Sequence, residues 1–230
     1  MCTRYVSPEA AAIERHWRIG RGQPFRWPRT ELFPKYAGPF LRAAGPQATP
    51  CIEVTLGQWW LIADGASERV PQAKTCNARW EDLARRWSFK GPWQRGQRCI
   101  IPAECFYEPN WESGRHEPWC FRAADGSPWG LAGLWNEWVD QATGESYLSY
   151  AMLTQNADQH DLMKRMHKPD PKLPPHAQDK RSVVPIAACD AAAWLFGSLT
   201  EATSMIRPAP VEWFDARPEV APPDPQGSLL

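Results

Sequence analysis

The chain has 230 residues, enough for one large domain or two small ones with a substantial core. Its 26 Lys and Arg residues balance its 26 Asp and Glu residues, so no net charge attracts a polyanionic partner to the protein as a whole. The seven cysteines include no C-x-x-C pair, which argues against a disulfide framework and against a zinc ribbon.

The sequence contains no run of 18 apolar residues, so we expect no membrane span. Residues 3–29 carry charges throughout and lack the apolar core of a signal peptide. No phosphate-binding glycine loop or dinucleotide fingerprint is present, and we expect neither a cofactor nor a metal. We expect a monomer in a reducing compartment, cytoplasmic and nucleoid-associated.

The N-terminal part is predicted to begin with a short strand over residues 2–6. Ser7-Pro8-Glu9 combines a cap, a proline and an acid, which predicts a helix over residues 10–19. Residues 23–50 are rich in proline and aromatic residues without periodicity, which predicts an extended surface loop.

The next segment, residues 51–63, is apolar and rich in β-forming residues. Gly57-Gln58 within it predicts the turn of a hairpin. In a strand, Trp59 and Trp60 point to opposite faces, so we expect one of them in the core and the other exposed.

The remaining predicted elements are strands interspersed with short helices. Their ranges are a helix over 80–89, strands over 98–107, 119–122, 129–139 and 147–154, a helix over 158–166, a strand over 183–186 and a helix over 190–196. Beyond residue 207 the sequence is proline-rich with little to bury, which predicts a disordered tail. The sum is a single α+β domain over residues 2–206, dominated by strands, and a tail over 207–230.

The N-terminus carries the first candidate for chemistry. A cysteine directly after Met1 is small enough for an aminopeptidase to remove the methionine, and Cys2 would then bear an amine with a pKa of about 8 and a thiol with one of about 8.5. The amine can condense with an aldehyde, and the thiol can close onto the imine carbon as a thiazolidine. The thiol can also serve as the nucleophile of an amidase or peptidase. The plain alternative is an inert residue at a frayed chain end.

Further polar residues stand at the ends of apolar elements. Asn77 can cap the next predicted helix, or act as an amide that orients a nucleophile. Glu108 follows an apolar strand, where we expect desolvation to raise its pKa and suit it to acid–base work; a solvated glutamate is the alternative. His167 ends a predicted helix, where it can interact with the helix dipole or shuttle protons. His160 lies two turns earlier on the same face, and the sequence does not choose between the two histidines.

Residues suited to nucleic acid are also present. Arg4 and Arg79 are candidate phosphate ligands, although isolated arginines are more often ordinary surface charges. Of the 14 Trp residues, most are expected in the core, while those near the surface can stack on bases.

Four motifs occur in one order along the chain. They are Met1-Cys2-x-Arg4, Asn77-Ala78-Arg79-x-Glu81, Arg98-Cys99-Ile100-Ile101-Pro102-Ala103 running into Phe106-Tyr107-Glu108, and Thr154-x-x-Ala157-x-x-x-x-Leu162-x-x-Arg165-Met166-His167. Together they resemble the SOS-response-associated peptidase (SRAP) family over about residues 2–190. The resemblance implies one α+β domain with a β-barrel-like, mixed or antiparallel core and a few short peripheral helices.

The resemblance also implies a function. Members of this family recognise abasic sites in single-stranded DNA and form a covalent thiazolidine crosslink. By this likeness Cys2 is the crosslinking residue, Asn77 orients it or its sugar, Glu108 is the general acid or base, and His167 is the second proton-transfer residue. Strand cleavage by a lyase reaction is a plausible side activity, and the peptidase label corresponds to removal of Met1 by the protein itself or to release of the crosslink.

The same likeness implies how DNA is held. Arg4 and Arg79 resemble the phosphate-contacting arginines of the family, and Trp59 or Trp60 resembles the aromatic residue that supports the strand near the lesion. The partner is then single-stranded DNA that contains abasic sites.

The sequence departs from the family pattern at three places. Thr3 stands where glycine is usual, Pro109 follows the glutamate where tryptophan is common, and the histidine segment reads His167-Lys168-Pro169. The resemblance implies that Cys2 lies in a groove for single-stranded DNA, and these differences affect the expected shape of that groove more than its reactive groups.

Two other classes of function remain open. A Cys-dependent peptidase or N-terminal-nucleophile amidohydrolase would use Cys2 with His167 as base and Asn77 in an oxyanion hole. A non-catalytic binder of single-stranded DNA would need only the Trp and Arg residues, and a Cys2→Ala variant would then behave normally.

Overall fold

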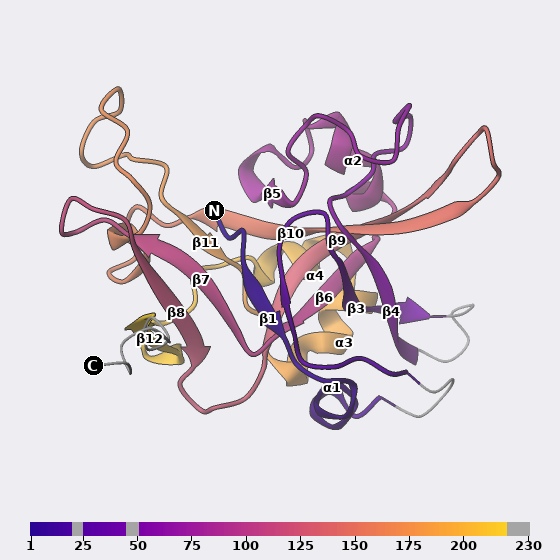
Figure 1. Cartoon of the computed structure of the whole chain (residues 1–230), viewed down its shortest axis with the longest axis horizontal. Coiled ribbons are helices and arrows are strands. Elements are labelled where there is room, and N and C mark those ends of the chain that lie inside the picture. The colour runs from indigo at the N-terminus through magenta and orange to yellow at the C-terminus, as the bar shows by residue number, and fades with distance from the viewer. Residues whose placement is uncertain (20–24, 45–50, 220–230) are drawn as a thin grey trace, which may run out of the picture.

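The computed structural model describes residues 1–19, 25–44 and 51–219. In these three stretches twelve strands form two sheets, and short helices lie around them (Figure 1). The strands are β1 Tyr5–Ser7, β2 Thr30–Leu32, β3 Ala37–Ala44, β4 Cys51–Trp59, β5 Asn77–Arg79, β6 Arg98–Ala103, β7 Cys105–Asn110, β8 Glu117–Ala123, β9 Trp129–Val139, β10 Ser146–Asn156, β11 Arg181–Val183 and β12 Phe214–Pro218. The helices are α1 Ala10–Trp17, α2 Trp87–Gln94, α3 Ala191–Phe196 and α4 Leu199–Met205.

The larger sheet closes into a barrel. Its strands follow the order β10-β4-β3-β6-β9, and β9 pairs again with β10. All of these pairs are antiparallel except β10 with β4, so the barrel is mixed. β5 and β11 extend β10 beyond the barrel. The predicted α+β fold with a barrel-like core and short peripheral helices is therefore confirmed.

The smaller sheet is antiparallel, with the strand order β12-β8-β7-β1-β2. It continues from the barrel because β6 runs almost directly into β7. This order places the N-terminal strand β1 between β2 and β7. The first residues of the chain therefore lie between two segments that are about 75 residues apart in the sequence.

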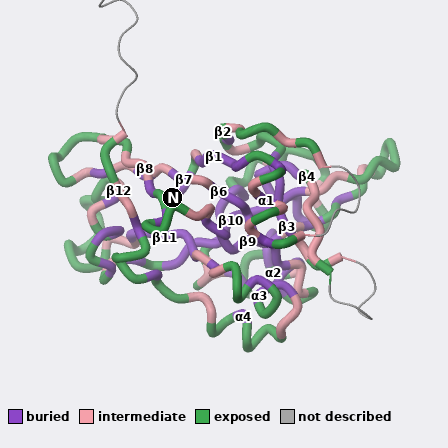
Figure 2. Tube along the Cα trace, turned by 90° about the horizontal axis from the view of Figure 1, so that it is seen from below, coloured by how far each residue is buried: buried purple, intermediate pink, exposed green. Residues whose placement is uncertain are grey.

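Two apolar clusters stabilise this arrangement. One joins barrel residues such as Trp59 and Tyr150 to Tyr5 and Phe106 of the smaller sheet. The other packs the opposite strand faces against the helices, which contribute large side chains such as Trp194. Figure 2 shows buried positions concentrated along the strands and exposed positions on the loops and outer sides of the helices.

The predicted loop over residues 23–50 is wrong for its described part, because this part contains β2 and all of β3. β2 pairs with β1, and β3 pairs with β4 and β6. Part of the predicted stretch, residues 20–24 and 45–50, lies outside the described residues. β3 pairs with β6, which lies more than 50 residues further along the chain. Because a strand is stabilised by such distant partners, the local sequence did not predict β3.

The predicted hairpin turn at Gly57-Gln58 is also wrong, because β4 continues through both residues and pairs with β3. A Cβ at Gly57 would lie 2.7 Å from a ring carbon of Phe40 and 3.0 Å from the carbonyl oxygen of Leu148. Glycine at this position thus permits close packing inside a strand, and it makes no turn.

The helices differ from prediction in extent. The predicted helix over 80–89 is a single 3₁₀ turn at Trp80–Asp82 followed by α2, and the predicted helix over 158–166 is only the 3₁₀ turn Met163–Arg165. α4 was not predicted, although its capping box of Ser198 with Glu201 is a sequence signature of a helix start.

The predicted tail over 207–230 begins inside the folded part of the chain. β12 pairs with β8, and Phe214 at its start is buried against the core of the smaller sheet. The reason is that an edge strand needs only a few residues and one apolar anchor. Residues 220–230 lie outside the described residues. Within the part of the chain that the structure describes, no helix is long and apolar enough to cross a membrane.

Candidate active site

Cys2 is a buried residue held in place from several sides. It precedes β1 and packs in the apolar cluster that contains Trp59 and Cys76. Asn77 donates from Nδ2 to the Cys2 carbonyl oxygen at 2.7 Å, and the Cys2 thiol donates to the Arg4 carbonyl oxygen at 3.4 Å. The N-terminus is therefore ordered, not frayed, and Figure 1 shows it beside β7 and β11.

An amine, a carboxylate and an imidazole meet at this terminus. The N-terminal ammonium of Met1 lies 3.4 Å from Oε2 of Glu108 and donates to Nε2 of His167. His167 Nε2 is in turn 2.7 Å from the same oxygen of Glu108. Because one ring nitrogen faces both groups, it can accept a proton from the amine or direct one to the carboxylate. The arrangement can move protons to and from an amine.

The electrostatics of Glu108 differ from the sequence-based expectation. Burial raises its pKa, but the N-terminal ammonium and His167 together outweigh burial, so the pKa of Glu108 lies below its usual value. The prediction of a raised pKa is therefore wrong, because it considered the apolar wall but not the N-terminal amine and the imidazole that tertiary structure brings to the carboxylate. Glu108 is ionised at neutral pH and suited to accept a proton.

The Cys2 thiol is shifted in the opposite direction. Burial raises its pKa, and the nearby charge of Glu108 raises it further. The sulfur is consequently a protonated thiol at neutral pH in this state, and it becomes a nucleophile only when a base removes its proton.

Asn77 lies on β5, opposite Met152 of β10, and not at a helix start. The helix-capping alternative is thereby excluded, since Asn77 begins the strand β5 and a 3₁₀ turn follows only at Trp80–Asp82. Its Nδ2 holds the Cys2 carbonyl, while its Oδ1 is buried without a hydrogen-bond partner among the described residues. The amide oxygen of Asn77 is thus available to accept a hydrogen bond.

His167 reaches the site because the chain turns sharply at this residue. Its φ is 63°, in the left-handed region, and its backbone N–H donates to Pro109 O at 2.7 Å. Lys180 is buried and donates from Nζ to the carbonyl oxygens of Met166 at 2.7 Å and His167 at 2.5 Å. Lys180 was not singled out from the sequence, and no local pattern distinguishes it from an ordinary surface lysine.

The two histidines have different roles. His160 donates from Nε2 to the Ala209 carbonyl at 2.8 Å, and its Nδ1 accepts from the backbone N–H groups of Leu162 and Met163. Both ring nitrogens are therefore used in holding a loop. The structure places His167, and not His160, beside Glu108 and the N-terminus.

The two candidate arginines lie near the site but carry ionic partners. Arg4 donates from Nε to Glu31 at 2.6 Å and from both terminal nitrogens to Glu219 at 2.7 Å, and its guanidinium lies 3.9 Å above the Tyr107 ring centre. Arg79 pairs with Asp179 at 2.5 Å. To bind phosphate, each would exchange a carboxylate for it.

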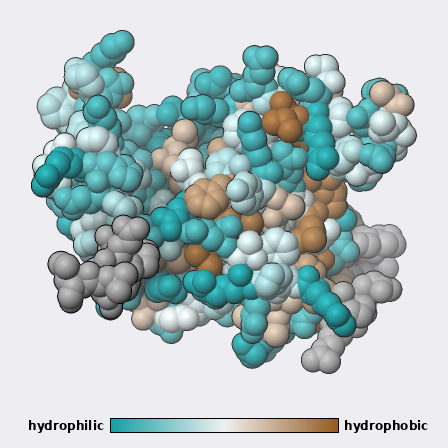
Figure 3. All heavy atoms as spheres, viewed as in Figure 1, coloured by the Kyte–Doolittle hydropathy of each residue, from teal (hydrophilic) through white to brown (hydrophobic). Residues whose placement is uncertain are grey.

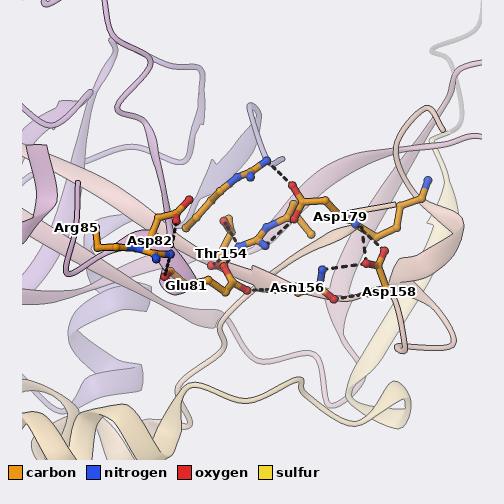
Figure 4. Close-up of polar contacts among 10 residues, drawn as sticks. Glu81, Asp82, Arg85, Thr154, Asn156, Asp158 and Asp179 are labelled. Atoms are coloured by element: carbon orange, nitrogen blue, oxygen red, sulfur yellow. Dashed lines mark hydrogen bonds and ion pairs between the residues drawn. The ribbon is translucent and has the colours of Figure 1, made fainter. Parts of the chain in front are cut away.

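Asp179 belongs to a wider polar network beside β10. Arg181 connects it to Glu81, at 3.1 and 2.7 Å. Figure 4 shows this group together with Asn156 and Asp158, whose carboxylate accepts from the backbone N–H of Asp179. The network fixes the segment that leads from His167 back to β11.

Trp59 and Trp60 are both buried, so the expectation that one of them is exposed is wrong. Their indole N–H groups donate to the carbonyl oxygens of Cys76 at 2.8 Å and Pro71 at 3.0 Å. Trp60 follows the end of β4, where the strict alternation of a strand no longer applies. Among the described residues, no group of three His, Cys, Asp or Glu side chains is arranged to hold a metal ion.

Comparison with known proteins gives a consistent result. A family model described as SOS response associated peptidase (SRAP) matches residues 1–221. The abasic site processing protein YoaM of Bacillus subtilis (strain 168) is 28% identical over 129 residues, which cover 56% of this chain and 55% of that protein. The abasic site processing protein HMCES of Gallus gallus is 26% identical over 123 residues, 44% of this chain and 37% of that protein. The matched parts span about half or less of these relatives.

Solved structures share the fold over nearly the whole chain. A crystal structure of a Bordetella bronchiseptica protein has a TM-score of 0.81 at 30% identity and covers 96% of this chain and 100% of its own. A crystal structure of a Bacteroides thetaiotaomicron protein has a TM-score of 0.74 at 20% identity, with 94% and 91% covered. Since the family model extends over both sheets and all four site residues, the chain belongs to the SOS response associated peptidase (SRAP) family.

Proposed function

We propose that this protein recognises abasic sites in single-stranded DNA and crosslinks them covalently through Cys2 after Met1 is removed. The observation that carries the proposal is that the amine of Met1 lies against Glu108 and His167, so removal of Met1 leaves the new Cys2 amine one residue away from both groups. The relatives named as abasic site processing proteins support the choice of substrate. We also propose that the protein acts in the cytoplasm, in association with the nucleoid.

The open form of an abasic deoxyribose offers an aldehyde at C1′. The neutral amine of Cys2 attacks this carbon, and Glu108 takes the proton that the amine gives up and passes it to the former carbonyl oxygen, which becomes a hydroxyl. His167 donates a proton to the departing hydroxyl, so one water leaves and a C1′–N iminium forms. The thiol then gives up its proton, which replaces the one that His167 donated, and its sulfur adds to C1′. The product is a five-membered thiazolidine, with one water released overall.

Asn77 contributes by fixing the reacting residue. Its Nδ2 holds the Cys2 carbonyl, and its unpartnered Oδ1 provides an acceptor for the new α-amine or for a sugar hydroxyl. Both nucleophiles then belong to one immobilised residue, which reduces the entropy lost on ring closure.

The hydrolase alternative has less support. A Cys–His nucleophile needs its thiol within hydrogen-bond reach of the imidazole. Here the Cys2 thiol donates to the Arg4 carbonyl, while His167 Nε2 faces Glu108 and the N-terminal amine. The geometry favours chemistry at the amine. β-Elimination from the iminium remains a side reaction that the thiazolidine suppresses, and the peptidase label fits removal of Met1.

The test is a denaturing gel and intact-mass measurement after mixing the protein with an oligonucleotide that carries one abasic site. We expect an adduct without borohydride whose mass is the sum of the Met1-free protein and the DNA minus one water. Cys2→Ala should form none, while Cys51→Ala, which removes an exposed internal thiol, should behave as wild type.

Two results would contradict the proposal. An adduct that is trapped only with borohydride would identify a Schiff-base lyase and remove the thiazolidine step. No adduct at all, with Met1 shown to be absent by mass, would exclude abasic-site chemistry and direct attention to amide substrates.

A further inference from the structure

An exposed aromatic pair lies on the turn between β2 and β3. Phe33 is 38% exposed and Tyr36 is 55% exposed, whereas most aromatic side chains of this protein are buried. The two rings meet edge to face, with centres 5.7 Å apart and planes at 68°. Figure 3 shows that the molecular face viewed in Figure 1 is mostly hydrophilic, with small apolar groups near its middle. Two exposed rings in contact with each other form an apolar surface on which a base can stack.

The backbone of this turn is held rigidly. The N–H of Lys35 donates to the Trp59 carbonyl at 3.0 Å, the N–H of Trp59 donates to the Tyr36 carbonyl at 2.9 Å, and the N–H of Tyr36 donates to the Phe33 carbonyl at 3.0 Å. Lys35 has a φ of 78°, a left-handed conformation that is unfavourable for a residue with a Cβ and that these bonds maintain. The aromatic pair is therefore presented in a fixed position.

The buried Trp59 and Trp60 contact this turn from the side of the core. Trp59 lies beneath it through the two backbone hydrogen bonds, and Lys35 Nζ lies 5.0 Å above the centre of the Trp60 ring. Trp59 also meets Tyr5 of β1 edge to face at 4.9 Å. The turn is thus connected through one indole to the strand that follows Cys2.

The register of the smaller sheet places the turn beside the N-terminal segment. Tyr5 of β1 pairs with Leu32 of β2, so the next residues outward are Arg4 and Phe33. Glu31 of β2 accepts from Arg4 at 2.6 Å, which shows that the two segments are in contact. Since β1 lies between β2 and β7, Glu108 flanks the N-terminus on one side and the aromatic turn flanks it on the other.

We propose that Tyr36 is a stacking platform for the base of the nucleotide next to the abasic site. This inference rests on the proposed function. An abasic nucleotide at Cys2 has no base of its own, so stacking must come from its neighbours, and aromatic side chains stack on any base. Phe33 holds the Tyr36 ring edge-on, and the exposed ammonium of Lys35 provides a positive charge for the adjacent phosphate. Trp59 and Trp60, one of which the family resemblance assigned to supporting the strand near the lesion, lie beneath the platform.

The test measures equilibrium binding of undamaged oligothymidine by fluorescence anisotropy at one fixed salt concentration. Tyr36→Ala should raise the Kd about tenfold, within the range for losing one base–aromatic stack. Tyr36→Phe should stay within about twofold of wild type, because the stack uses the ring and not the hydroxyl. Trp213→Ala removes another aromatic ring, which is 42% exposed and precedes β12, and should leave the Kd unchanged.

A second set of oligonucleotides separates stacking from a structural effect. In these, a tetrahydrofuran residue replaces the base at one position at a time. Removing the base that stacks on Tyr36 should weaken DNA binding by wild type and leave binding by Tyr36→Ala almost unchanged. The tenfold difference in Kd between the two proteins should then disappear. If the difference persists for every base removed, Tyr36 acts on the fold and the proposal is overturned.

The outcomes distinguish this inference from the crosslinking proposal. If wild type crosslinks abasic DNA and Tyr36→Ala binds oligothymidine as well as wild type, the platform is overturned and the crosslinking function stands. If wild type binds DNA without crosslinking and Tyr36→Ala weakens binding with the base dependence above, Tyr36 stacks on a base of single-stranded DNA in general, and the crosslinking function falls. Failure of wild type to bind single-stranded DNA overturns the platform.

Discussion

Lys180 is predicted to be a positioning residue for His167, and Lys180→Met tests this. The buried ammonium donates to the carbonyl oxygens of Met166 and His167, and it thereby maintains the left-handed conformation of His167. Burial lowers the pKa of Lys180, and Asp158 partly offsets this effect. Methionine keeps the length and the packing but removes both donors.

The magnitude follows from these contacts. Two hydrogen bonds from a charged donor are worth about 1.5–3 kcal/mol each. Part of that loss is offset because the variant no longer buries an ammonium ion, so we expect a net destabilisation of about 2–3 kcal/mol. For a chain of this size, that lowers the melting temperature by about 4–12 °C. The crosslinking rate should fall about 10- to 100-fold, because His167 no longer stays against Glu108.

The assay combines thermal unfolding with the time course of adduct formation on abasic single-stranded DNA, measured well below the melting temperature of each variant. Lys180→Arg keeps a charged donor and should recover part of the rate. Lys172→Met is the matched control, since Lys172 is exposed, and should change neither quantity. A melting temperature lowered as expected with a crosslinking rate within twofold of wild type would refute the positioning role.

Three further outcomes are expected. His160→Gln should lower the melting temperature by several degrees and leave the crosslinking rate of the folded protein unchanged, because His160 holds a loop at the Ala209 carbonyl; a lost rate at full stability contradicts this. The pKa of Glu108 is lowered from 4.5, so its ionised form contributes stability that is fully present above pH 4.5 and is lost as the pH falls through the lowered pKa. The difference in unfolding free energy between wild type and Glu108→Gln should therefore shrink on acidification, and a constant difference from pH 7 to pH 3 contradicts the ion pair. Glu219→Gln should free Arg4 for phosphate and tighten binding to single-stranded DNA about threefold at low salt, with a stability loss under about 1 kcal/mol for this half-exposed pair; anisotropy titrations showing weaker binding contradict the exchange.

The candidate site residues could be selected from the sequence because each has a recognisable local context. Cys2 follows the initiator methionine, Glu108 ends an apolar strand, and His167 ends the motif that contains Arg165 and Met166. The structure brings Cys2, Asn77, Glu108 and His167 to one place. The α+β class was predictable for the same reason, since strand composition and turn signals are local.

The contacts among these residues were decided by tertiary structure. His167 and Glu108 are 59 residues apart, and the N-terminal amine and His167 are 166 residues apart, so no pattern of spacing could reveal that they touch. The lowered pKa of Glu108 depends on those two partners, which is why reasoning from its apolar surroundings alone gave the wrong direction.

The sequence by itself determined which reactive side chains this protein possesses and that most of its regular structure consists of strands. Only the tertiary structure decided that Trp59 and Trp60 are buried, that Tyr36 is exposed above them, and that Lys180 holds His167. The physical reason is that residue type and strand propensity depend on near neighbours along the chain. Burial, charge pairing and strand order depend on segments that meet only after the barrel closes.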